Sequence, residues 1–428
     1  MSGQGSAPRR RRRSELIGAF GTIVEWYDFS LYVYLAPVYA RVFFGADGDD
    51  SSGLIATFMV FGVAYLARPL GAAFFGSLGD RVGRKLSLTA SASIMAGALL
   101  VNGLLPSEAS IGVAAAVLLT LTRLAMGFAV GGEYSGILVY LTEVADDRRR
   151  GFVASWSPAT AGLGSLLAVG VSALVTTSMS EEALDSWGWR IPLFIGAGLA
   201  VAVLALRRQL GETDAFEAIA TARHTSRRPL RDALRTARGA VLLAFALSAV
   251  GSLSYYLNIV FVPTYLGSYE GVSASAALRW STIATAVMLV TTPVFGLLSD
   301  RFGRRASLTS LGLAIALTTV PLYAWLGNNA LQAVVVASAL AVTAGGWSAV
   351  AAAAIPEQLP GHVRFSGVAL GYNVATAVFG GFTPLVATVL IEVTGSGSAP
   401  AVGCALFGLA GAVLAWTMRE TARRPLTP

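Results

Sequence analysis

Charged side chains are scarce in this sequence. Asp, Glu, Lys and Arg make up 13% of its 428 residues, about half of the roughly 25% that is usual in soluble domains. Hydrophobic residues make up 55% of the chain, and the mean hydropathy is +0.65. A chain with so little charge cannot cover its surface with polar groups. We therefore predict an all-α polytopic membrane protein.

Residues that form disulfides or bind metals are also few. The chain has one cysteine, Cys404, so no intrachain disulfide and no multi-thiolate metal site can form. Its two histidines, His224 and His362, both fall in polar connecting stretches. We expect no metal and no cofactor. The sequence also lacks a P-loop and a Ser/His/Asp set, so we expect a protein driven by an ion gradient rather than an enzyme.

Twelve stretches are long and apolar enough to cross a bilayer, since a spanning helix needs about 20 mostly apolar residues. They form two sets of six, in 15–208 and 239–418, separated by a polar cytoplasmic linker at 209–238. A basic tail, 1–14, precedes the first set, and a short tail, 419–428, follows the second. The predicted spans are 16–44, 53–77, 87–105, 111–143, 152–178, 189–208, 239–266, 274–298, 306–326, 330–355, 364–393 and 399–418.

The distribution of basic residues predicts how the chain sits in the membrane. Twenty-six of the 31 Lys and Arg residues lie in the two tails and in connections on one side only. The opposite connections carry acids instead: Asp47, Asp49, Asp50, Glu108, Glu181, Glu182, Asp185 and Glu270. Positive charge marks the cytoplasmic side, so both termini are predicted to be cytoplasmic. The net charge of +7 follows from this topology, and we expect a lipid bilayer rather than nucleic acid as the partner.

A fourteen-residue pattern occurs twice. GSLGDRVGRKLSLT at 76–89 and GLLSDRFGRRASLT at 296–309 share nine identical positions, and each follows the second span of its half. Internal duplication is typical of transporters, whose substrate site lies near the midplane between the repeats. Each copy predicts a tight cytoplasmic turn, in which Gly83 and Gly303 allow the backbone to reverse. A turn that is basic only because of topology is the simpler alternative, but recurrence at matching places favours a shared function.

We predict that these turns and the ends of neighbouring spans form a cytoplasmic gate. Arg84 is expected to pair with Glu143, and Asp80 is expected to lie near Phe365 or Ser366 at the start of the eleventh span. These contacts would latch the inner side when the outer side is open. The full set of predicted gate residues is Asp80, Arg81, Gly83, Arg84, Lys85, Glu143, Arg150, Asp300, Arg301, Gly303, Arg304 and Arg305.

Five charged residues lie deep within predicted spans. A charge at the bilayer centre costs at least about 2.5–3.5 kcal/mol, so such residues face a cavity or one another. Glu25, Asp28 and Tyr32 share one helix face at i, i+3 and i+7, and we infer that this face lines a central cavity. The residues expected to join it from the second and fourth spans are Arg68, Arg123 and Glu133.

The buried acids are candidates for carrying the proton. A carboxylate beside an arginine is stabilised as an anion, whereas desolvation favours the neutral acid. Asp28 and Glu25 are the first candidates and Glu133 is the third. Arg68 is the best candidate to hold a substrate carboxylate, because its guanidinium is a planar fork. Charges that simply pair to hold the first, second and fourth spans together remain the alternative for each single residue.

The second half has no acid or base deep in its predicted spans, so we expect it to supply aromatic and hydrogen-bonding contacts. The predicted substrate contacts, in addition to Arg68 and Tyr32, are Tyr255, Tyr256, Asn258, Tyr372 and Asn373. Helix packing is an equally good interpretation of these residues, and it is favoured for Trp347. Breaks that suit alternating access are predicted at Pro37, at Pro158 and at 380–384, because broken helices are tolerated where they line a cavity.

The duplicated turn matches the loop pattern G-x-x-x-D-R-x-G-R-[RK] of the major facilitator superfamily, which the chain resembles. It is most similar to the metabolite:H⁺ symporter branch, which includes permeases for 2-oxoglutarate, citrate, shikimate, and proline or betaine. The segments that carry this resemblance are GTIVEWYDFSLY, ARPLGAAFFGSLGDRVGRK, RLAMGFAVGGEYSG, WGWRIPLFIG and GYNVATAVFGGFTP. The resemblance implies a fold of two six-helix halves that works as a monomer, and it assigns Arg123 to proton coupling. The chain departs from the usual residues of this family at Thr22, Met126, Ile137 and Leu138, so the resemblance does not identify the substrate.

We therefore predict proton-coupled import of a small organic acid or zwitterion by alternating access across a bacterial inner membrane. Proton-coupled export of a drug or secondary metabolite is the alternative. Exporters of this superfamily usually carry G-x-x-x-G-P-x-x-G-G in the fifth span, whereas ASWSPATAGLGSLLAVG lacks the Gly-Pro pair. The single lysine, Lys85, among 31 basic residues suggests a GC-rich bacterial genome.

Overall fold

The computed structural model describes residues 15, 17, 20, 22–45, 51–222 and 225–427. The predicted tail 1–14, His224 and the acidic residues Asp47, Asp49 and Asp50 lie outside the described residues. Within the described ranges every regular element is a helix, as the composition predicts. Eleven of these helices are long and apolar enough to cross a membrane. The predicted first span is a twelfth unit, which is divided into two shorter helices.

The first half holds the elements that precede the linker. They are α2 (Thr22–Tyr34), α3 (Ala36–Phe44), α4 (Ser51–Arg81), α5 (Arg84–Leu104), α6 (Glu108–Ile111), α7 (Ala114–Val144), α8 (Arg150–Ser178), α9 (Glu181–Ala183), the π-helical turn η1 (Leu184–Gly188) and α10 (Arg190–Arg207). Two short helices form the linker, α11 (Asp214–Thr221) and α12 (Pro229–Thr236).

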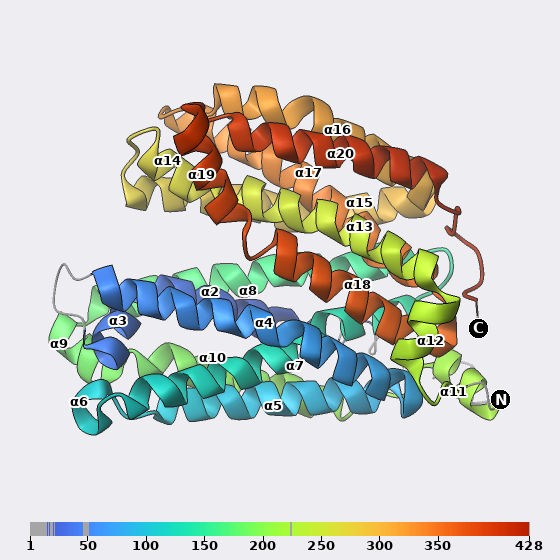
Figure 1. The fold of residues 1–428 in the computed structure, drawn as a ribbon, viewed down its shortest axis with the longest axis horizontal. Coiled ribbons are helices and arrows are strands. Elements are labelled where there is room, and N and C mark those ends of the chain that lie inside the picture. Colours follow the sequence, from blue (N-terminus) through green and yellow to red (C-terminus); the bar gives the residue numbers. More distant parts are fainter. Residues whose placement is uncertain are drawn as a thin grey trace, which may run out of the picture.

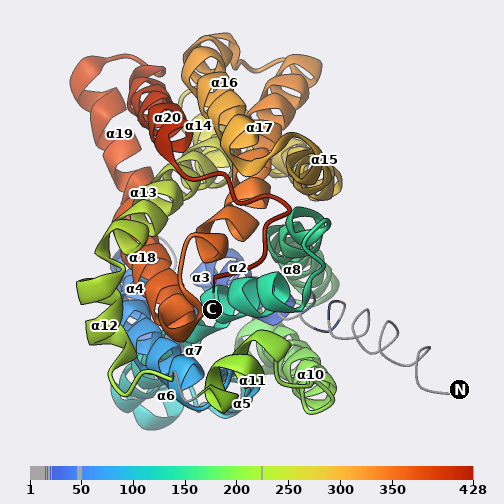
Figure 2. The same cartoon turned by 90° about the vertical axis from the view of Figure 1, so that its right-hand side faces the viewer.

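The second half follows the linker. Its elements are α13 (Arg238–Tyr255), the π-helical turn η2 (Tyr256–Val260), α14 (Val262–Ser268), α15 (Ala274–Phe302), α16 (Arg304–Trp325), α17 (Ala330–Glu357), the 3₁₀ turn η3 (Gly361–Val363), α18 (Arg364–Phe379), α19 (Thr383–Thr394) and α20 (Ala399–Thr417). Figure 1 shows the two halves as separate bundles whose long helices run along the molecule. Figure 2 shows the same bundles nearly end-on.

The two bundles meet along a few helices. From the first bundle α8 packs on α15 and α17, and α4 and α7 pack on α18. These four contacts enclose the space between the bundles. Any site that both halves share must therefore lie between these helices, near the middle of the molecule.

Small residues bring the helices within each bundle close together. A Cβ added at Gly71 would lie 1.8 Å from the carbonyl oxygen of Phe128, and one at Gly127 would lie 2.0 Å from that of Ala64. Such contacts fix α4 against α7, because in membranes close packing replaces the hydrophobic effect. In the second bundle, α16 and α20 approach closely at Gly312.

Two of the three predicted helix breaks are confirmed. α2 and α3 are separated at Leu35, with Pro37 in the first turn of α3, and α18 and α19 are separated at 380–382. The predicted break at Pro158 is wrong, because α8 continues through it. A proline within a long membrane helix removes one backbone hydrogen bond without ending the helix when neighbouring helices support it.

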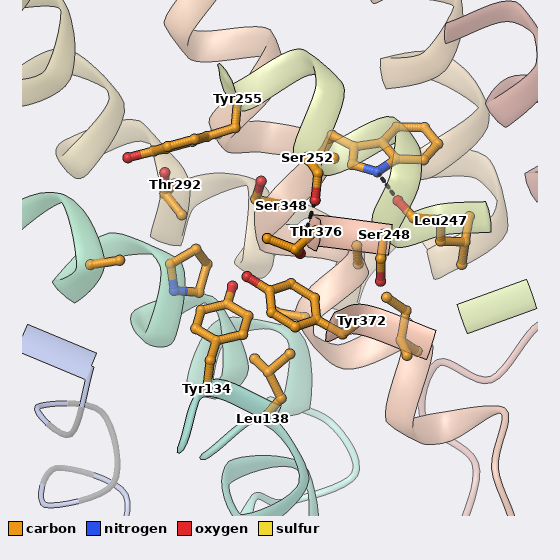
Figure 3. A pocket seen from close by; sticks show the side chains of 18 of the residues that line it. Tyr134, Leu138, Leu247, Ser248, Ser252, Tyr255, Thr292, Ser348, Tyr372 and Thr376 are labelled. Atoms are coloured by element: carbon orange, nitrogen blue, oxygen red, sulfur yellow. Dashed lines mark hydrogen bonds between the residues drawn. The ribbon is translucent and has the colours of Figure 1, made fainter. Parts of the chain in front are cut away.

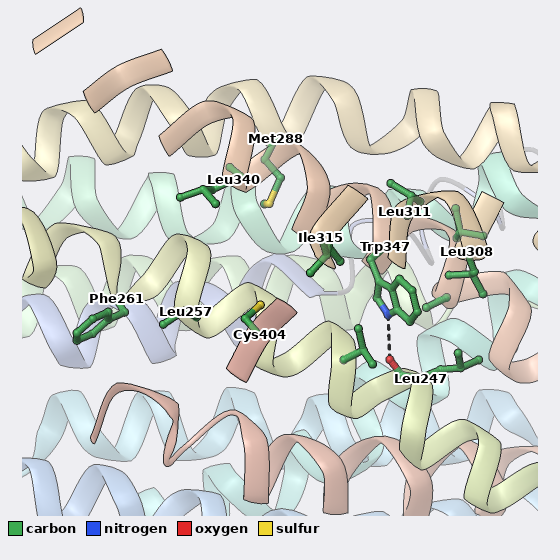
Figure 4. Close-up of a cluster of buried hydrophobic side chains, with 14 of the residues drawn as sticks. Leu247, Leu257, Phe261, Met288, Leu308, Leu311, Ile315, Leu340, Trp347 and Cys404 are labelled. Carbon is green, nitrogen blue, oxygen red and sulfur yellow. Dashed lines mark hydrogen bonds between the residues drawn. The ribbon is translucent and has the colours of Figure 1, made fainter. Parts of the chain in front are cut away.

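Trp347 anchors the core of the second bundle. Its side chain is fully buried, and its indole N–H donates to the carbonyl oxygen of Leu247 at 2.9 Å. Figure 4 shows this bond among the side chains of Leu308, Leu311 and Ile315. The packing interpretation of Trp347 is therefore confirmed. Its ring also reaches the space between the bundles.

Candidate functional site

Two adjoining cavities lie between the bundles. The central cavity has an empty volume of about 680 Å³, its open mouth included, and is lined by α7, α8, α13, η2, α15, α17 and α18, with Trp26 from α2. Its aromatic and hydroxyl-bearing lining residues are Trp26, Tyr134, Ser248, Ser252, Tyr255, Tyr256, Thr292, Trp347, Ser348, Tyr372 and Thr376. The outer cavity, of about 1050 Å³, shares Trp26, Tyr255 and Tyr256 with it. The three shared rings therefore separate the two spaces.

Aromatic rings form much of the wall of the central cavity. Tyr134 of the first bundle and Tyr372 of the second are stacked, with ring centroids 4.6 Å apart. Figure 3 shows this pair facing the hydroxyls of Ser252 and Thr376, which are hydrogen-bonded at 3.1 Å. The two halves thus contribute together to one polar, aromatic site.

Among the described residues, two buried polar groups on this wall lack a hydrogen-bond partner. They are the indole N–H of Trp26 and the hydroxyl of Ser248, which is 5% exposed. Leaving a buried donor unpaired costs about 1–3 kcal/mol, so such groups suit a ligand that supplies the missing acceptor. No charged side chain lines either cavity in the described part of the chain.

Asp28 and Arg123 form an ion pair inside the first bundle. Both guanidinium Nη atoms donate to the Asp28 carboxylate at 2.7 Å, and both side chains are buried. The ring of Tyr32 covers Arg123 at 4.6 Å, and its hydroxyl donates to the carbonyl oxygen of Thr57. None of these residues lines either cavity, so the prediction that they face the cavity is wrong. Their charges are balanced within the bundle instead.

Glu25 and Arg68 form a second, looser pair. Their charged atoms are 3.7 Å apart, and one carboxylate oxygen of Glu25 has no hydrogen-bond partner among the residues that the structure describes. The guanidinium carbon of Arg68 lies 4.3 Å from the ring centre of Phe29 and 4.4 Å from that of Tyr65. These rings hold Arg68 outside the linings of both cavities. Arg68 therefore does not line the cavity in which it was predicted to contact a substrate carboxylate.

Glu133 belongs to a third pair, with Arg207 of α10. Both of its carboxylate oxygens accept hydrogen bonds from Arg207, one of them at 2.9 Å, and Ser91 donates to it at 2.7 Å. This contact joins α5, α7 and α10. The prediction that Glu133 faces the cavity is wrong, and its arrangement favours the structural alternative. Arg123 and Glu133, which both belong to α7, therefore take part in different contacts.

The predicted substrate contacts of the second half divide into two groups. Tyr255, Tyr256 and Tyr372 line the central cavity, whereas Asn258 and Asn373 do not. Asn373 instead donates to the carbonyl oxygens of Gly131 and Ala369, both at 2.9 Å, and so joins α18 to α7.

The face of α2 that lines the cavities differs from the predicted one. Trp26, Ser30 and Val33 line the cavities, and their i, i+4, i+7 spacing defines one helix face. The charged face of Glu25 and Asp28 turns into the bundle. The available signal was the aromatic character of Trp26, which is typical of small-molecule sites.

One end of the molecule carries the connections 82–83, 145–149, 303 and 358–363 and the two linker helices. Arginines lie in these segments or flank them, among them Arg81, Arg84, Arg148, Arg149, Arg301, Arg304 and Arg364, so this end is called here the arginine-rich end. There, Asp80 of α4 accepts the backbone N–H groups of Phe365 and Ser366 at 3.1 and 2.8 Å. Both predicted contacts of Asp80 are therefore confirmed. A carboxylate at the first turn of a helix is favoured by the helix dipole, so Asp80 ties the first bundle to α18.

The second repeat makes the same contact in the opposite sense. Asp300 of α15 accepts the backbone N–H groups of Gly151 and Phe152, each at 2.8 Å. It therefore ties the second bundle to the start of α8. The two aspartates stand at equivalent places in the duplicated pattern.

Two buried glutamates complete the contact. Glu143 accepts hydrogen bonds from Arg84 of its own half, as predicted, and from Arg364 of the other half at 2.8 Å. The equivalent residue, Glu357, binds Arg304 of its own half and Arg150 of the other half at 3.3 Å. Each glutamate therefore joins both bundles, and the arginine-rich end is closed.

A further pair of acids was missed. Glu212 accepts the backbone N–H groups of Arg84 and Lys85, and Glu420 accepts those of Arg304 and Arg305. The signal was the dipeptide Glu-Thr, which follows the last long helix of each half at 212–213 and 420–421. The threonines extend the contact, since Thr213 donates to Glu143 and Thr421 to Glu357, both at 2.6 Å.

These acids explain what the neighbouring gate residues do. Gly83 and Gly303 have φ of +132° and +98°, which suits glycine, and each lies against the carboxylate of the nearby glutamate. Lys85 and Arg305 contribute backbone N–H groups here. The side chains of Arg81 and Arg301, which were predicted to belong to the gate, are exposed and make no ion pair in the described chain.

The two acids differ in pKa. Burial raises the pKa of Glu212, and its backbone hydrogen bonds do not fully offset this. Burial also acts on Glu420, but hydrogen bonds from Ala422, Arg304 and Arg305 outweigh it and lower the pKa. Glu212 and Glu420 occupy equivalent positions in the two halves, yet the surroundings disfavour the ionised form of Glu212 and favour that of Glu420.

Two helical bundles that share a polar cavity, with duplicated contacts closing one end, define an alternating-access membrane transporter. A profile of the family described as "Sugar (and other) transporter" matches residues 15–239 and 219–427. The chain belongs to this family of the major facilitator superfamily. It is a secondary transporter of small organic metabolites and not an enzyme.

Named relatives cover almost the whole chain. A proline/betaine transporter of Salmonella typhimurium is 34% identical over 425 residues, which is 97% of this chain and 85% of the relative. An alpha-ketoglutarate permease of Escherichia coli is 37% identical over 390 residues, covering 90% and 89%. A citrate-proton symporter of Klebsiella pneumoniae is 35% identical over 382 residues, covering 89% and 85%.

The fold is also similar to solved structures. The proton:xylose symporter bound to 6-bromo-6-deoxy-D-glucose superimposes with a TM-score of 0.80 over 98% of both chains, at 17% identity. At this identity the likeness concerns the fold alone. It agrees with the predicted arrangement of twelve helices in two halves.

Proposed function

We propose that the protein imports a small zwitterionic metabolite together with a proton into a bacterial cell, and that it works as a monomer. The observation that carries this proposal is the central cavity, which is lined by aromatic rings, hydroxyls and unpaired donors, with no charged side chain in the described chain. The arginine-rich end is the cytoplasmic end in this proposal, in agreement with the positive-inside rule.

The absence of charge on the described wall favours a substrate with no net charge. A di- or tricarboxylate would enter without a cation to balance it, and burying an unpaired ion is very costly. A zwitterion balances its own charges. Its carboxylate can accept hydrogen bonds from Trp26 and Ser248, and its ammonium group can lie against the faces of Tyr134 and Tyr372. Such cation–π contacts contribute about 0.5–2 kcal/mol each.

The relatives include both kinds of substrate. The proline/betaine transporter of Salmonella typhimurium is named for zwitterions, and the citrate-proton symporter of Klebsiella pneumoniae is named for a tricarboxylate. The neutral wall of the central cavity supports the first kind for this chain.

The pair of Asp28 and Arg123 is the proposed proton site. A bidentate Arg–carboxylate pair stabilises the ionised acid. When α2 moves relative to α7 within the first bundle and this pair separates, the desolvated carboxylate favours the protonated form. Because the pair lies outside the cavity linings, the substrate acts on it through movement of α2, whose Trp26 faces the cavity. Glu25, with its loose contact to Arg68, is the second candidate.

Substrate uptake by purified protein in liposomes tests the proposal. With an inward proton gradient, we expect accumulation of glycine betaine or proline, and little accumulation of citrate or 2-oxoglutarate. Gradient-driven accumulation of a carboxylate alone would overturn the substrate class but keep proton-coupled import. Failure of an inward proton gradient to drive uptake of any compound, with efflux from the liposomes instead, would overturn import.

A further inference from the structure

The linker helix α12 lies on the outside of the arginine-rich end. It packs against α4 of the first bundle and against α13, α18 and η3 of the second. Figure 1 shows it crossing the direction of the long helices, and Figure 2 shows it at the outer edge of the molecule. A helix in this position lies roughly parallel to the membrane surface, at the level where lipid headgroups surround the protein.

The residues of α12 divide into four faces. Pro229 and Ala233 are buried against the bundles. One flank carries Leu230 and Leu234, the latter 49% exposed. The opposite flank is polar: its residues are Asp232 and Thr236. The remaining face points directly away from the protein, since Arg231 and Arg235 lie about 180° from Ala233 and Pro229 at 3.6 residues per turn.

The arginines of this region differ from those that are buried. The buried arginines, such as Arg84, Arg123 and Arg364, are paired with acids. Exposed arginines of this end, such as Arg148 and Arg149, form no ion pair within the described chain, and the same holds for five around α12. They are Arg227, Arg228, Arg231, Arg235 and Arg238. Asp232, the acid of this helix, is hydrogen-bonded by Ser226. The positive charge of α12 is therefore available to a partner.

We propose that α12 binds the headgroups of anionic phospholipids. An amphipathic helix with leucines on one flank and arginines beside them lies in the membrane interface, with its apolar side toward the acyl chains and its basic side toward phosphates. Basic clusters beside membrane spans are attracted to anionic lipids. A membrane surface supplies both the apolar and the anionic partner that this helix lacks, whereas a soluble anion supplies only the second.

Lipid binding at α12 acts on the closed end of the transporter. α12 packs on both α4 and α18, which are the two helices that Asp80 joins through Phe365 and Ser366. Opening of this end separates α4 from α18, so it must also release α12 from one of them. Anionic lipid held by α12 therefore stabilises the closed end. This consequence rests on the proposed function, but the binding of lipid does not.

Lipid binding is measured first, on the purified full chain in a mild detergent. Fluorescent phosphatidylglycerol and phosphatidylcholine are titrated against the wild type and Arg231→Gln/Arg235→Gln. The control removes the same charge from the connection between α7 and α8, with Arg148→Gln/Arg149→Gln. We expect the α12 variant to lose about tenfold or more of its affinity for phosphatidylglycerol, while the control and Arg231→Lys/Arg235→Lys keep it. Equal losses in the α12 variant and the control would overturn the proposal.

Opening of the arginine-rich end is measured second. Ala352, which lines the central cavity, is replaced by Cys in a Cys404→Ser background and labelled with a membrane-impermeant thiol reagent from the arginine-rich side. We expect phosphatidylglycerol to slow labelling severalfold relative to phosphatidylcholine, and Arg231→Gln/Arg235→Gln to remove this effect. Lipid binding without any effect on labelling would overturn the link between α12 and the gate. If uptake of substrate were unchanged in that case, the proposed transport function would still stand.

Discussion

At the scale of single residues, the buried charges separate into pairs with different expected roles. Asp28→Asn is expected to abolish accumulation of substrate driven by a proton gradient but to preserve exchange of substrate across the membrane, because exchange needs no net movement of a proton. The control is Glu133→Gln, which also breaks a buried pair. Breaking such a pair costs about 3–5 kcal/mol of stability, so both variants should unfold more easily, yet Glu133→Gln should keep proton coupling. Loss of coupling in both variants alike would contradict the assignment.

The turns of the repeat give a second prediction for single residues. Gly83 has a positive φ of +132°, and a Cβ there would lie 2.2 Å from a carboxylate oxygen of Glu212. Gly83→Ala is expected to destabilise the protein by about 1–3 kcal/mol, as measured by thermal unfolding in detergent. Gly97→Ala, inside α5 with open space around the Cβ, should be neutral or stabilising.

Glu420 and Glu212 give a third prediction, in which the stability lost on replacement by Gln changes with pH in opposite directions at the two residues. The pKa of Glu420 is lowered from 4.5, so its ionised form stabilises the fold above that pH, and this contribution is lost as pH falls through the lowered pKa. The stability lost in Glu420→Gln should therefore grow as pH rises from 3.5 to 6. The pKa of Glu212 is raised, so the effect of Glu212→Gln should shrink over the same range. If the stability lost in both variants changed in the same direction with pH, the difference between the two pKa values would be contradicted.

The sequence was sufficient to identify the charged residues of the membrane but not their surroundings. The helical spacing of Glu25, Asp28 and Tyr32 predicted that they share one face of α2, which is correct. The direction of that face depends on Arg123, whose position relative to α2 is set by packing among three helices. Because an arginine inside the bundle balances the acid, the aromatic face with Trp26 turns to the cavity instead.

At the scale of helices, the packing of α4 against α7 depends on glycine. Gly127→Ala would place a Cβ 2.0 Å from a backbone carbonyl oxygen, which the helix cannot avoid by a change of rotamer. We expect a loss of about 1–3 kcal/mol and a lower unfolding temperature. Gly62→Ala in α4 is the matched control, because nothing lies within 4 Å of its Cβ. An equal effect at both sites would contradict the role of this close contact.

Helices were more predictable than their interruptions. Their lengths follow from bilayer thickness and composition, so the predicted spans agree with the helices to within a few residues at most ends. The breaks at Pro37 and near 380–384 were predicted, whereas α8 continues through Pro158. The π-helical turn η2 after Tyr255 was not foreseen, because its sequence contains no proline or glycine to indicate a break. Whether a helix breaks depends on what its neighbours offer to the freed backbone groups.

At the scale of the whole molecule, the closed end depends on both repeats. Asp80→Asn should weaken the contact with Phe365 and Ser366, and Asp300→Asn should weaken the one with Gly151 and Phe152. Labelling of Ala352→Cys from the arginine-rich side, in a Cys404→Ser background, should rise severalfold in each variant and most in the double variant. Unchanged labelling in both single variants would contradict a latch function. Asp214→Asn, a surface acid of α11, is the control.

The duplicated contacts also say something about how such a chain could arise. Asp80 of the first half binds the start of α18 in the second, and Asp300 of the second half binds the start of α8 in the first. In each case an aspartate of one half contacts a segment of the other half, and the equivalent aspartate makes the equivalent contact in return. This is the pattern of an isologous interface between two identical subunits. The polypeptide is therefore built like a twofold homodimer whose subunits have been joined by the linker. Once joined, each half was free to diverge, which is why the first half now holds the ion pairs deep within the spans, while the second supplies most of the hydroxyl groups of the central cavity.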